Sequence, residues 1–262
     1  MFLQRMSIYE ILGLTLAAMA GGVINAVAGG GTLVTFPTLL FFGMAPVQAN
    51  ATSTLALVIG TSGSIFGYRQ HVPSVRVWLR SFVPASLLGG LIGSVLLTFT
   101  SNQTFSKLVP FLILFATVLF FAQGLVRRLV NLEQQHAPSR YGTVLGAALF
   151  QFMVAVYGGY FGAGIGILML ASLGFIGLHN IHEMNTLKTI LGSLINLVAA
   201  AWFVISGLIS WPQAAVMTIG AVAGYFLGSH YSQRIPQTRV RQIITIIGLA
   251  LSLVTFYQEF IR

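Results

Sequence analysis

Runs of about 20 apolar residues recur along this chain from one end to the other, with short polar stretches between them. At a rise of 1.5 Å per residue, a helix of roughly 20 residues crosses the hydrocarbon layer of a bilayer, which is about 30 Å thick. Of the 262 residues, 56% are hydrophobic and 6% are charged. A soluble domain of this length could not cover its surface with so few charges. The sequence therefore predicts an all-α polytopic membrane protein without a separate soluble domain.

The apolar segments differ in length. They cover 7–28, 32–43, 47–68, 77–99, 106–126, 141–160, 164–178, 183–206, 212–230 and 240–258. Two of them, 32–43 and 164–178, are too short to cross as upright helices, and each follows a glycine-rich break, "GGG" at 29–31 or "GAG" at 162–164. If both short segments cross as broken helices, the protein has ten transmembrane segments. If both re-enter on the same side, it has eight.

The basic residues sort to one side if every segment changes the side of the membrane. One side receives only Arg5, Lys107 and Arg262. The other side receives Arg69, Arg76, Arg80, Arg127, Arg128, Arg140, Lys188, Arg234, Arg239 and Arg241. The positive-inside rule makes this richer side cytoplasmic and leaves both chain ends outside. The stretch 127–140 is then a cytoplasmic linker between a first repeat, 1–126, and a second, 141–262. Because the bases lie between apolar runs and form no single basic face, the net charge of +9 does not indicate nucleic acid as a partner.

The two halves resemble each other when the chain is slid along itself by 134 positions. This shift lays one short segment on the other and brings both glycine breaks into register. It matches Gly30 with Gly164, Gly43 with Gly177, Thr52 with Thr186 and Gly90 with Gly224. Since each half has five segments, an odd number, the second half enters the membrane from the opposite side. Two inverted repeats, each with four full spans and one short broken helix, are typical of secondary transporters.

The glycine breaks predict a binding site for a small anion near the middle of the membrane. Non-helical backbone is tolerated at that depth only where protein or a water-filled cavity surrounds it. A helix that begins at Thr32 presents free N–H groups and the positive end of its dipole, and the second break supplies another helix start around 164–166. Each helix end contributes only about 0.3 to 2 kcal/mol, less than the dehydration cost of an ion. Side-chain hydrogen bonds must supply the remainder.

Polar residues at helical spacing follow each break. One stripe consists of Asn50, Thr54, Thr61, Ser64 and Tyr68. The other consists of Asn185, Thr189, Gly192 and Asn196. Lys188 lies beside the second stripe and either contacts the ligand or extends its ammonium group to the cytoplasmic surface. For each of these residues the alternative is helix packing, since small and polar residues let membrane helices approach and bond to one another.

Few residues in this chain suit other chemistry. There is no cysteine, which excludes disulfides, thiol chemistry and Cys-ligated zinc. No nucleotide-binding or H-E-x-x-H pattern is present, so we expect neither an enzyme nor a cofactor. Glu183, with His179 and His182 before it, either titrates during transport or is a helix-start acid. The apolar start after Arg5 could pass for a signal peptide, but Glu10 and the unbroken continuation into further spans predict that it is retained.

Two stretches carry a resemblance to a known family. They are "GGVINAVAGGGTLVTFPTLLFFGMAPVQANATSTL" at 21–55 and "GGYFGAGIGILMLASLGFIGLHNIHEMNTLKTILGSLINLVAAAWFVISGLISW" at 158–211. With them, nearly the whole chain resembles the TauE/SafE sulfite exporters and related anion permeases. The resemblance implies a multi-pass protein of the cell (inner) membrane that moves sulfite, sulfoacetate or other organosulfonates without ATP hydrolysis. Another small organic acid stays open as the substrate, because members of the family differ.

The resemblance also implies substrate-binding positions. They are Gly29, Gly30, Gly31, Thr32, Asn50, Thr52, Ser53, Gly162, Gly164, Gly166, Asn185, Thr186 and Lys188, and the second stripe adds Asn196. The leading hypothesis is a secondary transporter that works by alternating access, and the alternative is a passive anion channel. Counterflow separates the two. The partners we expect are a small anion, the lipid bilayer and a coupling ion, either proton or sodium. The sequence gives neither the direction of transport nor the oligomeric state.

Overall fold

The computed structural model describes residues 6–27, 29–67, 72–133, 141–175, 178, 181–231 and 237–261. Within these ranges, all regular secondary structure is α-helical. The helices are α1 (Ile8–Val27), α2 (Thr32–Phe41), α3 (Pro46–Gly67), α4 (Val72–Phe99), α5 (Asn102–Glu133), α6 (Tyr141–Tyr160), α7 (Ile165–Phe175), α8 (Ile181–Ile205), α9 (Trp211–Tyr231) and α10 (Gln237–Phe260). Each apolar segment of the sequence corresponds to one of these helices, and the predicted all-α class is confirmed.

The boundaries follow the expected ones closely, with one extension. The short segments are the short helices α2 and α7. α5 continues through Glu133, so the first part of the predicted linker, 127–133, is helical. The rest of that linker, 134–140, lies outside the described residues. The division into two repeats at this linker stays a prediction.

Both long helices that precede a short helix end at a glycine in the left-handed region. Gly29 after α1 has a φ of 78°, and Gly162 after α6 has a φ of 83°. The Gly29 N–H bonds to the Ile24 carbonyl, and the Gly162 N–H bonds to the Tyr157 carbonyl, each at 3.2 Å. Because residues with a Cβ rarely adopt this φ, glycine lets the chain leave one helix and begin the next within a few residues.

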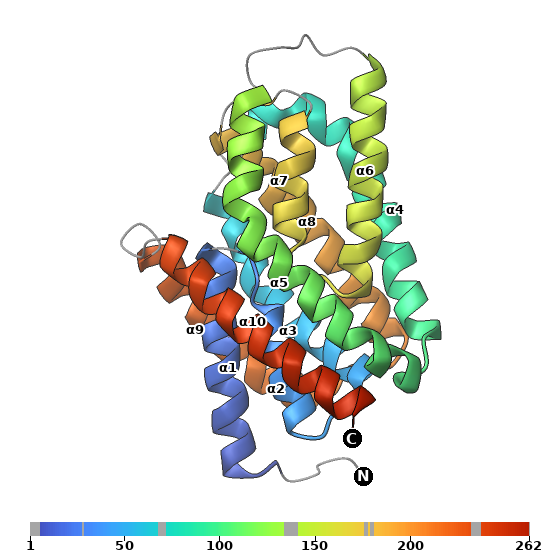
Figure 1. The fold of residues 1–262 in the computed structure, drawn as a ribbon, viewed down its shortest axis with the longest axis vertical. Coiled ribbons are helices and arrows are strands. Elements are labelled where there is room, and N and C mark those ends of the chain that lie inside the picture. Colours follow the sequence, from blue (N-terminus) through green and yellow to red (C-terminus); the bar gives the residue numbers. More distant parts are fainter. Residues whose placement is uncertain are drawn as a thin grey trace.

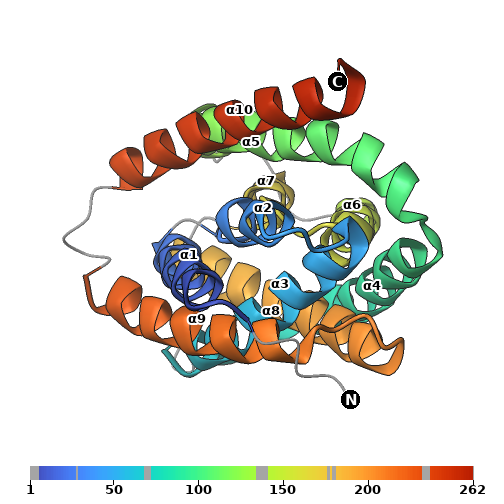
Figure 2. The ribbon, with the colours of Figure 1, turned by 90° about the horizontal axis from the view of Figure 1, so that it is seen from below.

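The helices form layers around the two short helices. In the view along the long axis, α5 and α10 run along one side and α4 and α9 along the other, with α2 and α7 near the centre (Figure 2). In the perpendicular view, α2 runs from the middle of the molecule toward the lower end, where α1 begins and α10 ends. α7 runs from the middle toward the upper end (Figure 1). The two helix starts therefore lie near the middle and the helices point to opposite ends.

The packing of the two halves follows one scheme. α1 packs on α9, and its counterpart α6 packs on α4. Likewise α3 packs on α9 and α8 packs on α4, while α3 contacts α8 and α5 contacts α10. Exchange of the two halves maps α1·α9 onto α6·α4 and α3·α9 onto α8·α4, and it maps α3·α8 and α5·α10 each onto itself, as a two-fold related pair of repeats requires. How each half is oriented in a membrane stays a prediction.

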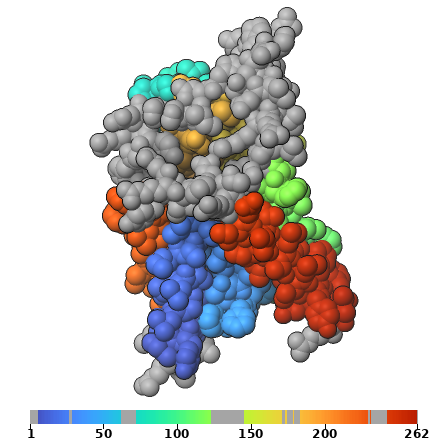
Figure 3. Space-filling view, turned by 60° about the vertical axis from the view of Figure 1, so that its left-hand side comes forward, coloured from blue at the N-terminus to red at the C-terminus, as the bar shows by residue number. Residues whose placement is uncertain are grey.

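The outer surface is apolar. Phe99, Phe121, Ile219 and Leu253 are more than two-thirds exposed, although the same helices bury other apolar residues against one another. Figure 3 shows α1, α2 and α10 together on one face of the lower half. Among the described residues, α1, α4, α5, α8 and α10 contain stretches long and apolar enough to cross a membrane. These faces match a surface that lipid covers.

Candidate functional site

A cavity of about 810 Å³ lies where the two glycine breaks meet. Gly29 from the first break and Gly162 from the second both line it. α1, α3, α8 and α9 form the remaining walls, together with the starts of α2 and α7. The starts of α2 and α7 bring the positive ends of two helix dipoles to the cavity wall, although the Leu33 and Ile167 N–H groups already bond to the Gly30 and Gly164 carbonyls. The structure thus brings the two halves of the predicted site together.

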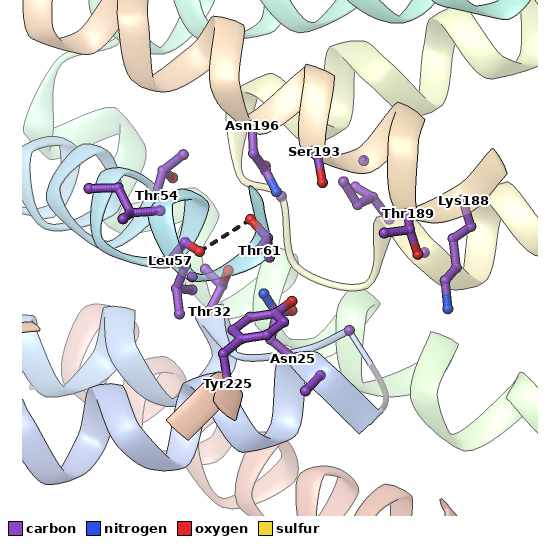
Figure 4. Close-up of a pocket in the computed structure, with 18 of the residues that line it drawn as sticks. Asn25, Thr32, Thr54, Leu57, Thr61, Lys188, Thr189, Ser193, Asn196 and Tyr225 are labelled. Carbon is purple, nitrogen blue, oxygen red and sulfur yellow. Dashed lines mark hydrogen bonds between the residues drawn. The ribbon is translucent and has the colours of Figure 1, made fainter. Parts of the chain in front are cut away.

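The wall from the first half carries amide and hydroxyl groups. Asn25 comes from the end of α1 and Thr32 from the start of α2, and Tyr225 of α9 lies beside them (Figure 4). Thr54 and Thr61 of α3 also line the cavity, but their hydroxyl protons are used within the helix. Thr54 Oγ1 donates to the Asn50 carbonyl at 2.9 Å, and Thr61 Oγ1 donates to the Val58 carbonyl at 2.9 Å. These two hydroxyls therefore face the cavity as acceptors.

The wall from the second half carries the charge. Thr189, Ser193 and Asn196 lie on one face of α8, at positions i, i+4 and i+7, and Lys188 lines the cavity beside them. In Figure 4, Asn196 points toward Thr61, and Lys188 lies at the far side of the cavity. An ideal Cβ at Gly166 would lie 3.3 Å from Lys188 Cδ. The missing side chain at Gly166 therefore leaves room for the Lys188 stem over the start of α7.

The electrostatics of the cavity favour an anion. Among the described residues that line it, Lys188 carries a formal charge and the others are uncharged. Hydroxyl and amide donors from several helices line the same cavity, while Leu57, Phe161, Ile165 and Met169 supply apolar wall. A site with one cation, several neutral donors and an apolar part can hold a small oxyanion that carries a short hydrocarbon group.

Six of the predicted binding positions line the cavity. They are Gly29, Thr32, Gly162, Gly166, Lys188 and Asn196. The other eight lie outside its lining. They are Gly30, Gly31, Asn50, Thr52, Ser53, Gly164, Asn185 and Thr186.

Three of these eight connect α3 to its neighbours. Asn50 Nδ2 donates to the Tyr160 carbonyl at 3.0 Å, and the hydroxyls of Ser53 and Thr35 are 2.6 Å apart. Thr52 Oγ1 accepts the Ser210 N–H at 3.1 Å. These bonds match the packing alternative for small polar residues in membrane helices. Whether any of the eight contacts a substrate stays a prediction.

Several lining residues did not belong to the predicted set. Thr54, Thr61, Thr189 and Gly192 belong to the two polar stripes, so helical spacing alone indicates them. Ser64 and Tyr68 of the first stripe have side chains outside the described part of the structure.

Asn25, Ser193 and Tyr225 are absent from both stripes and from the binding positions that the resemblance implies. Asn25 precedes Gly29 by four residues, one helical turn, and Ser193 follows Gly192. Their positions beside the glycine break and beside the second stripe could therefore have indicated both residues. Tyr225 depends on contact between helices, because its ring lies where a side chain at Gly60 would be, 2.9 Å from an ideal Cβ. The spacing of residues along the sequence cannot reveal this contact between two helices.

Glu183, near the start of α8, does not line the cavity. Glu183 is in the first turn of α8 and is half-buried, whereas the side chain of His182 falls outside the described residues, as does His179. Within the described part of the chain, no three His, Asp or Glu side chains group as metal ligands would.

The comparisons with known proteins match this chain over nearly its whole length. The family model described as "Sulfite exporter TauE/SafE" matches residues 14–255. A probable membrane transporter protein of Haemophilus influenzae is 28% identical over 90% of both chains. The probable membrane transporter protein ORF9 of a Sinorhizobium species is 26% identical over 96% of this chain and 94% of that protein. YfcA of Escherichia coli K12, also a probable membrane transporter protein, is 26% identical over 92% of this chain and 88% of its own length. No solved structure shows a significant match.

Proposed function

Because the chain belongs to the TauE/SafE sulfite exporter family, a family of membrane transporters, we propose that it is a secondary transporter of small sulfur-containing anions. It is a multi-pass membrane protein, and the substrate and the mechanism are the proposed part. The observation that carries the proposal is the cavity between the two glycine breaks, which Lys188 lines together with uncharged hydroxyl and amide donors. Sulfite, sulfoacetate and other organosulfonates are the substrates that we propose.

The chemistry of a sulfonate fits this cavity. A sulfonate carries one negative charge on three oxygen acceptors, which matches one lysine and several hydroxyl and amide donors. Hydrogen bonds to a charged group contribute about 1.5 to 3 kcal/mol each, so three or four of them offset an effective desolvation cost of several kcal/mol. The apolar wall at Leu57, Ile165 and Met169 suits the carbon part of the substrate.

We further propose alternating access, in which one half moves relative to the other around the cavity. The paired packing of α1 with α9 and of α6 with α4 supports this proposal, because the cavity lies between elements of both halves. The coupling ion, proton or sodium, belongs to the same proposal and is identified by the gradient that drives uptake.

Reconstitution in liposomes tests the proposal. We expect saturable uptake of labelled sulfite, sulfoacetate or taurine, and counterflow when unlabelled substrate is loaded inside. Uptake with an imposed proton or sodium gradient then identifies the coupling ion. If none of these compounds moves, the substrate class is wrong. Flux that follows the electrical gradient without counterflow identifies a channel instead.

Thr32→Val provides a test of the cavity wall at the start of α2. Valine keeps the shape of threonine and removes the hydroxyl, so we expect the KM for the transported anion to rise about five-fold, the equivalent of one hydrogen bond of about 1 kcal/mol. Thr38→Val on the same helix is the matched control, because Thr38 Oγ1 donates to the Val34 carbonyl at 2.7 Å and does not line the cavity. Equal KM values for the two variants would remove Thr32 from the site.

A further inference from the structure

Three phenylalanine rings pack together where α2 runs from the cavity toward the lower end of the molecule (Figure 1). Phe36 belongs to α2, Phe105 to the first turn of α5, and Phe161 lies between α6 and α7. The ring centroids of Phe36 and Phe161 are 5.5 Å apart, those of Phe36 and Phe105 6.2 Å, and those of Phe105 and Phe161 6.5 Å. Their exposed fractions are 0%, 0% and 1%. We call these three residues the aromatic seal.

Phe161 belongs to the cavity and to the seal at the same time. Its side chain lines the cavity, and its ring packs edge-to-face against those of both other members of the seal. Its backbone position, directly before Gly162, is the break between α6 and α7. A change of direction at this break would therefore move the Phe161 ring relative to Phe36 and Phe105.

Hydrogen bonds between the two halves gather around the seal. Asn50 Nδ2 on α3 donates to the Tyr160 carbonyl at 3.0 Å, and the Tyr160 hydroxyl is 3.2 Å from Thr100 Oγ1 after α4. Trp202 Nε1 near the end of α8 donates to Thr98 Oγ1 at 3.0 Å. These bonds join helix ends that lie toward the lower end in Figure 1.

Two more bonds of this kind join the halves on the same side. The Ser210 N–H before α9 donates to Thr52 Oγ1 on α3, and Gln213 Nε2 on α9 donates to Glu10 Oε1 on α1, each at 3.1 Å. Apart from the Glu10 carboxylate, the groups in these cross-half bonds are uncharged, so water can replace each partner if the halves separate here.

We propose that the aromatic seal is the gate that closes the cavity toward the end where α1 begins, with Phe161 as its moving part. This inference rests on the proposed function, since a transporter must open its site to each side in turn. The rings come from both halves, α2 and α5 from the first and the α6–α7 break from the second. Movement of one half relative to the other therefore separates Phe161 from Phe36 and Phe105. A permanent hydrophobic core would keep them together.

The gate can be tested by thiol labelling, because the sequence contains no cysteine and any cysteine introduced is the only one. A Thr32→Cys reporter in the cavity is labelled with a membrane-impermeant thiol reagent in sealed vesicles of each orientation. A Gln103→Cys reporter, exposed beside the start of α5, identifies the vesicles in which the lower end faces the reagent.

When the reagent faces the lower end, we expect Phe161→Ala to speed labelling of the Thr32→Cys reporter roughly tenfold or more, because removal of a buried phenyl group weakens the closed state. Phe82→Ala is the matched control, with the same loss of volume. Phe82 is fully buried in α4, where its ring stacks on Trp78 at 6.2 Å, in a different core cluster. This control should label at the parental rate.

If the Phe161→Ala variant does not accumulate, Phe161→Leu replaces it, because leucine keeps most of the side-chain volume and the fold. It should give a labelling rate between that of the parental reporter and that expected for the alanine variant. Rapid labelling of the parental reporter from the lower side, or equal rates with and without Phe161→Ala in folded protein, would overturn the gate. The readout needs no substrate. A changed labelling rate in a protein that moves no sulfur-containing anion would leave the gate standing and refute the proposed substrates.

Discussion

Gly93→Ala is expected to abolish or strongly reduce the folded protein. An alanine Cβ at this position on α4 would overlap the Val156 carbonyl oxygen and lie 2.8 Å from the Tyr160 amide nitrogen, both in the backbone of α6. Because backbone atoms cannot rotate out of the way as a side chain can, α4 and α6 must move apart along their whole contact. We expect a loss of about 3 kcal/mol or more. Thermal unfolding in detergent, followed by fluorescence-detected size-exclusion chromatography, measures it.

Gly146→Ala is the matched control for this prediction. Gly146 lies on α6 as well, is exposed, and has nothing within 4 Å of an ideal Cβ. Alanine there should leave the unfolding temperature unchanged or raise it slightly, since alanine is favoured over glycine in a helix by up to about 1 kcal/mol. Gly224→Ala should repeat the Gly93 result, because its Cβ would overlap the Met19 carbonyl oxygen in the corresponding pair, α9 and α1. Unfolding of Gly93→Ala at the parental temperature would contradict the close approach of these helices.

Lys188→Met is expected to weaken anion binding about 30- to 100-fold while the protein stays folded. Methionine has a similar length and no charge, so the change removes the cation of the cavity and its charge-assisted hydrogen bonds, a loss of about 2 to 3 kcal/mol. Lys188→Arg keeps the charge, but its larger head group must fit above Gly166, where the lysine stem already lies close. We therefore expect it to recover only part of the affinity. Concentration-dependent uptake in liposomes gives KM, and ligand-induced thermal shifts give binding without transport.

Lys107→Met controls for the loss of a positive charge elsewhere. Lys107 is exposed in the second turn of α5 and does not line the cavity, so transport should continue with an unchanged KM. Parental KM values for Lys188→Met would show that the lysine serves as an anchor to the membrane surface, the alternative that its sequence position left open.

The helices and the two breaks could be predicted from the sequence because their signals are local. The length of an apolar run fixes a membrane helix, and consecutive glycines mark the place where its backbone order stops. Residues that share a helix face, such as Thr54 with Thr61 and Thr189 with Asn196, could be grouped by spacing alone. Both pairs lie in the wall of the cavity.

The sequence could not say which way each helix is rotated about its axis. Asn50 and Thr54 are one turn apart on α3, yet Asn50 bonds to α6 backbone and Thr54 lines the cavity. The difference depends on what packs against each turn, and that contact comes from residues about a hundred positions away. Tyr225 escaped prediction for the same reason, since its place in the wall depends on α9 lying against Gly60 of α3.

The shared packing scheme of the two halves has a consequence for the balance between the states of the protein. If the halves exchanged their roles, the residues 134 positions from Phe36, Phe105 and Phe161 would close the other end, and these are Leu170, Arg239 and Val27. Leucine and valine bury less surface than two phenyl rings and lack their edge-to-face contact. The closed states at the two ends therefore differ in stability, although the two halves share one packing scheme. The empty protein should therefore rest with its aromatic side shut, and substrate or a driving gradient must supply the difference in free energy for the opposite state.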